Sequence, residues 1–184
     1  MSLPILDFRC NDQLPTRPEI EALRIENGLH GRGIAIRKSP DGDIVARVKY
    51  GVYVTTTEAL TQEYVATRDL DADSTTVVRA PHVFDVWVTS NPLFSVGFIV
   101  MEHINLPDCD HGDSKLVVAA VQRLHGVEAP GPAPGPFGGG RTVHHFFLDW
   151  DSRITYKTVK ELEDHINGVS ELYLPIRPND LESR

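Results

Sequence analysis

Alternation of apolar and polar positions predicts two pairs of β-strands. Apolar, β-branched residues favour strands over 34–36 and 44–48, and the Ser-Pro-Asp-Gly-Asp run between them is typical of a tight turn. Two further strands are predicted over 83–88 and 96–104, joined by Thr-Ser-Asn-Pro, which is again a turn composition. The pattern therefore predicts two β-hairpins.

Between the two hairpins, the spacing changes to that of a helix. Thr55 and Glu58 stand three residues apart, as in a capping box, and apolar residues follow on helical spacing to about Asp69. Upstream of the first hairpin, residues 19–29 fit either a short helix or a first strand. If they form a strand, the sheet has five strands.

Two more helices are predicted after the second hairpin. One covers Leu116–Leu124, and the other opens at a capping box headed by Thr158 and stops at Gly168. Residues 130–140, between them, are dense in proline and glycine and predict a linker. Because strands and helices are segregated along the chain, we expect an α+β fold with a mainly antiparallel sheet.

The composition limits the partners of such a fold. The 184 residues are 41% hydrophobic and 24% charged, as in one soluble globular domain. A formal net charge of -8 argues against a nucleic-acid partner. The apolar runs are far shorter than the roughly 20 residues of a membrane span, and the start lacks a signal-peptide pattern, so we expect a cytoplasmic protein without a membrane partner. Cys10 and Cys109 are expected to be free thiols.

A glycine cluster precedes the first hairpin. Gly28, Gly31 and Gly33 have no side chain that would keep phosphate oxygens away from backbone N–H groups. An ordinary surface turn explains the three glycines equally well. If the turn does meet a nucleotide, Gly31 and Gly33 are the expected contacts.

Charged residues follow on the hairpin and on the next helix. Arg47 and Lys49 are two apart in a strand and share one face, so either could reach a phosphate, and we favour Lys49. Glu58 could hold Lys49 in place, as a helix glutamate does in kinases. It could equally be the reciprocal residue of the capping box. The two roles compete for one carboxylate.

In order and spacing, these segments resemble the aminoglycoside-phosphotransferase-like family, especially its fungal members. The similarity is carried by Val-Ala-Arg-Val-Lys-Tyr-Gly (45–51), Glu-Ala (58–59), Tyr-Val (64–65), Arg-Ala-Pro-His-Val-Phe-Asp-Val (79–86) and Gly-Phe-Ile-Val-Met-Glu-His-Ile (97–104). The resemblance implies an N-terminal arm over 1–18 and a protein-kinase-like N-lobe, with a five-stranded antiparallel sheet and one helix, over 19–101. A hinge and a partial helical C-lobe would occupy 102–184.

The resemblance also implies roles for particular residues. Lys49 would contact the phosphates of ATP, and Glu58 would pair with Lys49. The hinge would offer backbone donors and acceptors to adenine from Glu102, His103 and Ile104. The acceptor substrate of this small-molecule phosphotransferase family is not indicated by the sequence.

The family's motifs for phosphoryl transfer are not recognisable in this chain. His111-Gly112-Asp113 resembles the start of the catalytic loop His-Gly-Asp-x-x-x-x-Asn, but Val118 stands where the asparagine should be. We interpret it as a polar turn ahead of a helix. Asp149-Trp150-Asp151 resembles the metal-binding motif but stands in a stretch that matches another part of the family. We therefore assign no catalytic or metal-binding residue.

Two functional hypotheses follow. The chain is expected to be a truncated, inactive kinase-like domain that binds ATP weakly, with magnesium only if a complete C-lobe exists. The alternative is a pseudokinase-like module that binds a nucleotide or a protein. A truncated lobe exposes apolar surface, so self-association is also expected.

Overall fold

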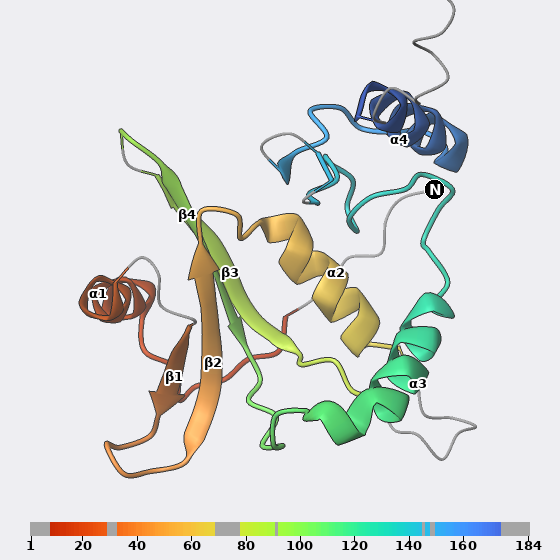
Figure 1. The fold of residues 1–184 in the computed structure, drawn as a ribbon. Helices are drawn as coiled ribbons and strands as arrows, with labels where there is room; N and C mark the ends of the chain where they lie inside the picture. The colour runs from red at the N-terminus through yellow and green to blue at the C-terminus, as the bar shows by residue number, and fades with distance from the viewer. Residues whose placement is uncertain are drawn as a thin grey trace, which may run out of the picture. The chain divides into compact units, whose positions relative to one another are not determined.

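The computed structural model describes residues 8–28, 33–68, 78–90, 92–144, 146–147 and 150–173. The chain forms two compact units, Met1–Glu128 and Ala129–Arg184. Figure 1 shows the elements, which in chain order are α1 (Arg17–Asn27), β1 (Ile34–Arg37), β2 (Ile44–Gly51), α2 (Thr56–Ala66), β3 (Val83–Ser90), β4 (Ser95–Met101), η1 (His111–Asp113), α3 (Ser114–His125) and α4 (Val159–Tyr173).

The first unit is built on a four-stranded antiparallel sheet with strand order β1-β2-β4-β3. This confirms the predicted α+β class and both hairpins. The expected fifth strand is not found among the described residues, because residues 17–27 form helix α1. At its start, Thr16 and Glu19 make a capping box, and a proline occupies the first turn, which favours a helix.

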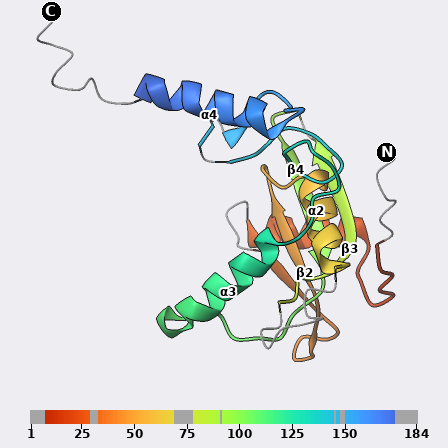
Figure 2. The same cartoon turned by 90° about the vertical axis from the view of Figure 1, so that its right-hand side faces the viewer.

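Helices cover the two faces of this sheet. On one face, Ile20 of α1 packs into a core formed by Ile36, Ala46, Val48, Tyr50, Trp87, Val96, Phe98 and Val100. On the other face, Ala59 of α2 packs with Val54, Val83 and Ile99. Figure 2 shows α2 lying along the strands. Because side chains alternate along a strand, Arg47 and Lys49 lie on the face that carries α2.

The connection from β2 to α2 lies directly on β4. A Cβ built on Gly97 would overlap the carbonyl oxygen of Val54 and lie 2.7 Å from the carbonyl carbon. Real Cβ atoms essentially never approach other atoms so closely. Glycine at position 97 therefore allows the chain to enter α2 close above the sheet.

After β4, the chain passes through the predicted hinge segment into η1 and α3. The helix was expected over Leu116–Leu124 and is found over Ser114–His125. None of its residues is buried, and its exposed apolar side chains are Leu116, Val117, Val118, Val121 and Leu124. Within the described residues, no helix has the length and apolar character needed to cross a membrane.

The second unit contains helix α4. The Thr158 hydroxyl accepts a hydrogen bond from the Glu161 N–H (3.2 Å), as the capping box predicts. The predicted stop at Gly168 is wrong, because the helix continues to Tyr173. Glycine costs only about 1 kcal/mol in a helix interior, so without a left-handed capping conformation it does not end a helix.

Candidate functional site

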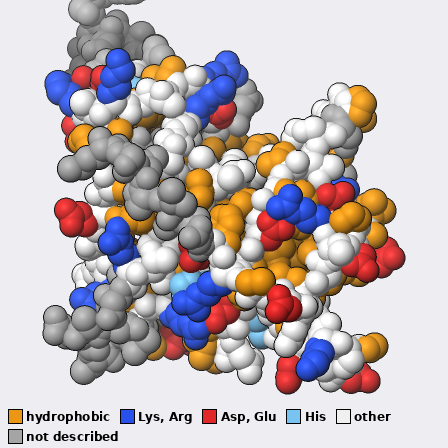
Figure 3. All heavy atoms as spheres, turned by 180° about the vertical axis from the view of Figure 1, so that it is seen from behind, with side chains coloured by type: hydrophobic (Ala, Val, Ile, Leu, Met, Phe, Trp, Pro, Cys, Tyr) orange, Lys and Arg blue, Asp and Glu red, His pale blue; other side chains and the backbone are white. Residues whose placement is uncertain are grey.

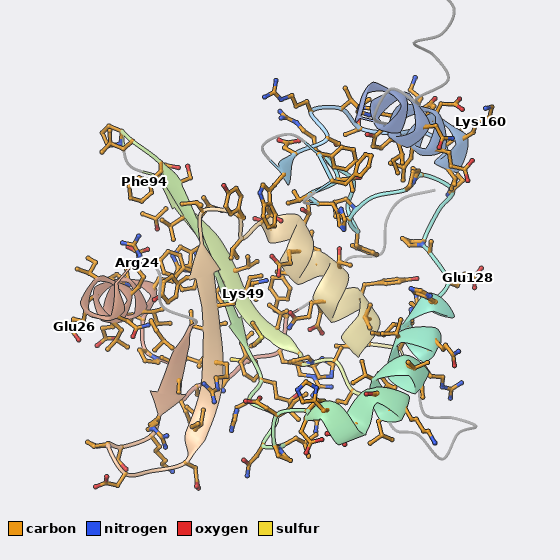
Figure 4. The ribbon with its side chains drawn as sticks, in the orientation of Figure 1. Arg24, Glu26, Lys49, Phe94, Glu128 and Lys160 are labelled. Carbon is orange, nitrogen blue, oxygen red and sulfur yellow. The ribbon has the colours of Figure 1, made fainter. Side chains whose placement is uncertain are left out.

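The predicted ion pair between Lys49 and Glu58 is present. The Lys49 Nζ, from the middle of the sheet, contacts the Glu58 Oε1, from the first turn of α2. Figure 4 labels Lys49 on the side of the sheet that carries α2. The side chains are 51% and 35% exposed, so solvent, or a ligand, can reach both. The structure thus confirms the pair, while its role toward a nucleotide stays a prediction.

The structure also decides between the two roles weighed for Glu58. The Glu58 backbone N–H donates to the Thr55 hydroxyl (3.1 Å), so Thr55 caps α2 through its side chain. The Glu58 carboxylate instead turns to Lys49. Capping by the threonine hydroxyl leaves the carboxylate available, so the expected conflict does not arise.

The hinge end of the sheet carries a second set of charged side chains. Glu102 forms an ion pair with Arg79, and the Arg47 Nε approaches the His103 Nδ1 at 3.5 Å. Arg47 pairs in register with Met101, the last residue of β4. Arg47 therefore reaches toward the hinge, while Lys49, on the same face, reaches toward α2.

Part of the hinge backbone is already hydrogen-bonded within the protein. The Glu102 N–H donates to the His82 carbonyl (2.9 Å), and the Ile104 carbonyl accepts from the Leu106 N–H (3.0 Å). Among the described residues, this leaves the Glu102 carbonyl and the N–H groups of His103 and Ile104 as the candidates for the edge of an adenine ring.

The glycine turn is only partly described. Gly31 lies outside the described residues. Gly33 has a φ of 116°, and a Cβ there would lie 2.7 Å from the Val48 carbonyl oxygen, so close packing on β2 explains this glycine without a ligand. The register pairs Ile34 with Val48, which places Gly33 beside Lys49 in the continued ladder. The turn joins a helix to a strand, not two strands.

The apparent catalytic motif is a local capping turn, as interpreted from the sequence. Asp110 accepts a hydrogen bond from the Gly112 N–H (2.6 Å), and the Asp113 carboxylate accepts from the Asp110 N–H (3.0 Å). Of the apparent metal motif, Asp149 lies outside the described residues, and Asp151 forms an ion pair with Arg141 at 2.9 Å.

The sequence reasoning missed a buried carboxylate next to this site. Glu63 of α2 is 2% exposed and bonds to the Nδ1 of His82 (3.0 Å) and the N–H of Val83 (2.6 Å). Glu63 stands four residues after Ala59 and so shares its helix face, but a charged residue at such a position usually reaches solvent, and no partner for it is visible nearby in the sequence. Its burial depends on residues about twenty positions later in the chain.

Two cationic side chains lie on the face of β2 that carries α2. Arg47 and Lys49 place two cationic side chains on one strand face; Arg47 lies beside His103, after β4, and Lys49 pairs with Glu58 of α2. Over the face drawn in Figure 3, basic and acidic side chains are interspersed, so charges of one sign are offset by neighbours of the other. Within the described residues, no three His, Cys, Asp or Glu side chains gather as a metal site would need.

Comparisons with family models, with curated proteins and with solved structures gave no match. The fold and the site define the first unit only as an α+β unit with an antiparallel sheet, in which a strand lysine pairs with a helix glutamate.

Proposed function

We propose that residues 19–101, within the first compact unit, are a kinase-like N-lobe of the aminoglycoside-phosphotransferase-like type that binds ATP together with the hinge segment after it. The Lys49–Glu58 ion pair carries the proposal. Kinases hold the phosphates of ATP with a strand lysine that a helix glutamate positions. In this unit a strand and the following helix supply the same two groups, in the same order.

The position of the hinge segment supports this proposal. Lys49 pairs in register with Ile99 on β4, and the hinge begins just after Met101 on that strand. From Ile99 to Glu102, the first proposed adenine contact, is three residues, or about 10 Å along an extended strand, so the proposed phosphate and adenine ends are on neighbouring strands. Adenine would meet the Glu102 carbonyl and the N–H groups of His103 and Ile104.

Two features depart from the kinase arrangement. Lys49 lies on the second described strand, whereas a kinase lysine lies on the third. The glycine turn follows α1, so no strand pair is available to close over the phosphates at that point. Fewer phosphate contacts mean weaker binding, so we expect an affinity for ATP well below that of an active kinase.

We further propose that this chain binds ATP without transferring its phosphate, as a pseudokinase-like module does. Phosphoryl transfer needs a positioned aspartate and magnesium ligands, and the two described candidates, Asp113 and Asp151, serve as a capping and an ion-pair residue. Magnesium would be held by the nucleotide itself. Self-association stays an expectation, and sedimentation velocity at several concentrations would measure it.

The test is ATP binding by isothermal titration, with magnesium and with EDTA. We expect measurable weak binding that Lys49→Ala reduces by about tenfold or more, since a charge-assisted bond to phosphate is lost. Lys38→Ala removes an exposed lysine at the far end of the β1–β2 hairpin and serves as the matched control. Equal affinities for the wild-type and Lys49→Ala proteins would refute the assignment of Lys49. Turnover of ATP in the wild-type protein would refute the inactive reading.

A further inference from the structure

Helix α2 contributes one side chain to the buried apolar cluster that lies between it and the sheet. Of its residues, only Ala59, Glu63 and Tyr64 are buried. Ala59 is the one residue of α2 in the apolar cluster on this face, and a single alanine buries little apolar area. The position of α2 must therefore be fixed by other interactions.

Glu63 supplies the first of these interactions. An unpaired carboxylate would be costly to bury, but both oxygens of Glu63 are satisfied. Oε2 accepts from the Val83 N–H at 2.6 Å, and Oε1 lies 3.0 Å from the Nδ1 of His82. Both partners belong to the segment that enters β3, so one side chain joins the helix to that strand.

Gln62 supplies a second interaction with the same segment. Its Nε2 donates to the Pro81 carbonyl at 2.8 Å. Two consecutive residues of α2 thus hold the consecutive residues Pro81, His82 and Val83. Such a paired attachment fixes the helix along its axis as well as in its distance from the sheet.

His82 also holds the hinge. Its carbonyl accepts from the Glu102 N–H at 2.9 Å, and its own N–H lies 3.5 Å from the Glu102 Oε2, while Glu102 is paired with Arg79. One residue therefore contacts both the helix that carries Glu58 and the segment proposed to meet adenine. Glu58 stands five residues before Glu63, about 7.5 Å along the helix axis.

We propose that Glu63 and His82 are positioning residues: they fix α2 so that Glu58 meets Lys49, and they tie that helix to the hinge. The effect that we expect on ATP binding rests on the proposed function, whereas the placement of α2 does not. Neither residue needs to touch a nucleotide. Their effect on Lys49 passes through the helix backbone and Glu58.

The experiment compares Glu63→Gln, His82→Gln and, as a matched control, Glu26→Gln, which alters an exposed glutamate of α1. Three measurements are made on each protein. Hydrogen exchange compares the protection of α2 with that of β4, carbon-detected NMR follows the chemical shift of the Glu58 carboxylate at one pH, and isothermal titration gives the affinity for ATP.

In Glu63→Gln and His82→Gln we expect exchange in α2 to quicken by about tenfold or more, as expected when a buried charged hydrogen bond is lost. Exchange in β4 should stay unchanged. The NMR signal of the Glu58 carboxylate carbon should move toward its position in Lys49→Ala, where the ion pair is absent, which a general loss of stability would not cause in the folded state. The control should match the wild-type protein in all three measurements.

Two results would overturn the inference. One is that hydrogen exchange in α2 and the chemical shift of the Glu58 carboxylate are both unchanged in both variants. The other is global unfolding of both, which would make the pair a determinant of the fold and not of helix position. Failure of the proposed function looks different: ATP would bind equally to wild-type and Lys49→Ala proteins, while the α2 changes in the Glu63 and His82 variants would persist.

Discussion

Replacement of Gly97 by alanine tests how closely the chain packs above the sheet. The added methyl group would overlap the Val54 carbonyl oxygen, and it would lie 2.7 Å from the carbonyl carbon and 3.1 Å from the Val54 Cβ. The nearest atoms belong to backbone, which cannot rotate away as a side-chain end does. Either β4 or the connection into α2 must move.

The size of the effect follows from these distances. Carbon atoms reach their best separation at about 3.5–4.0 Å, so the two segments must part by about 1 Å. Overpacking of this kind costs about 1–3 kcal/mol, and because both sides are backbone we expect about 3 kcal/mol. For a unit of this size that is a fall in Tm of about 12 °C, out of a total stability of roughly 5–15 kcal/mol.

Trp87 offers a direct probe of this unfolding. It is buried, and its ring stacks on that of Phe98, next to the substituted position, with centroids 4.8 Å apart. In a Trp150→Phe background, it is the one tryptophan left in the chain. Urea unfolding followed by its fluorescence should show the loss of about 3 kcal/mol in Gly97→Ala. A change below about 0.5 kcal/mol would refute the close approach of Val54 to β4.

Two further predictions concern the helices. Gly168→Ala adds the same methyl group inside α4, where no other atom lies within 4 Å of it. Because alanine favours a helix over glycine, thermal unfolding should show the second unit stabilised by about 0.5–1 kcal/mol. Destabilisation would contradict a helix that continues through this residue. The Thr16 hydroxyl and the Thr16 N–H donate hydrogen bonds to the Glu19 carboxylate and lower its pKa. The stability that Glu19 gives to α1 is therefore present at a pH above the pKa of Glu19 in the unfolded chain, and it is lost as the pH falls through the pKa of Glu19 in the folded protein. An NMR titration should give a low pKa for Glu19 that Thr16→Ala raises, and an unchanged value in that variant would count against this cap.

Turns and helix starts in both units could be predicted from the sequence alone. The turn between β1 and β2 and the capping threonines of α2 and α4 act within a few residues, so their chemistry is visible in a short window. The Lys49–Glu58 pair was also predicted, from the order of a strand lysine and a helix glutamate in kinases.

Other features depended on contacts between distant parts of the chain. Residues 19–29 fitted helix or strand equally well in the sequence. The structure has a helix over Arg17–Asn27, which Ile20 packs against the sheet. Glu63 looked like any solvent-facing glutamate, and only the meeting of α2 with His82 and Val83 made it a buried, paired carboxylate. Turns and helix caps depend on neighbouring residues and can be predicted from the sequence. The burial of a side chain depends on which distant segments pack against it, and this is determined by the tertiary structure.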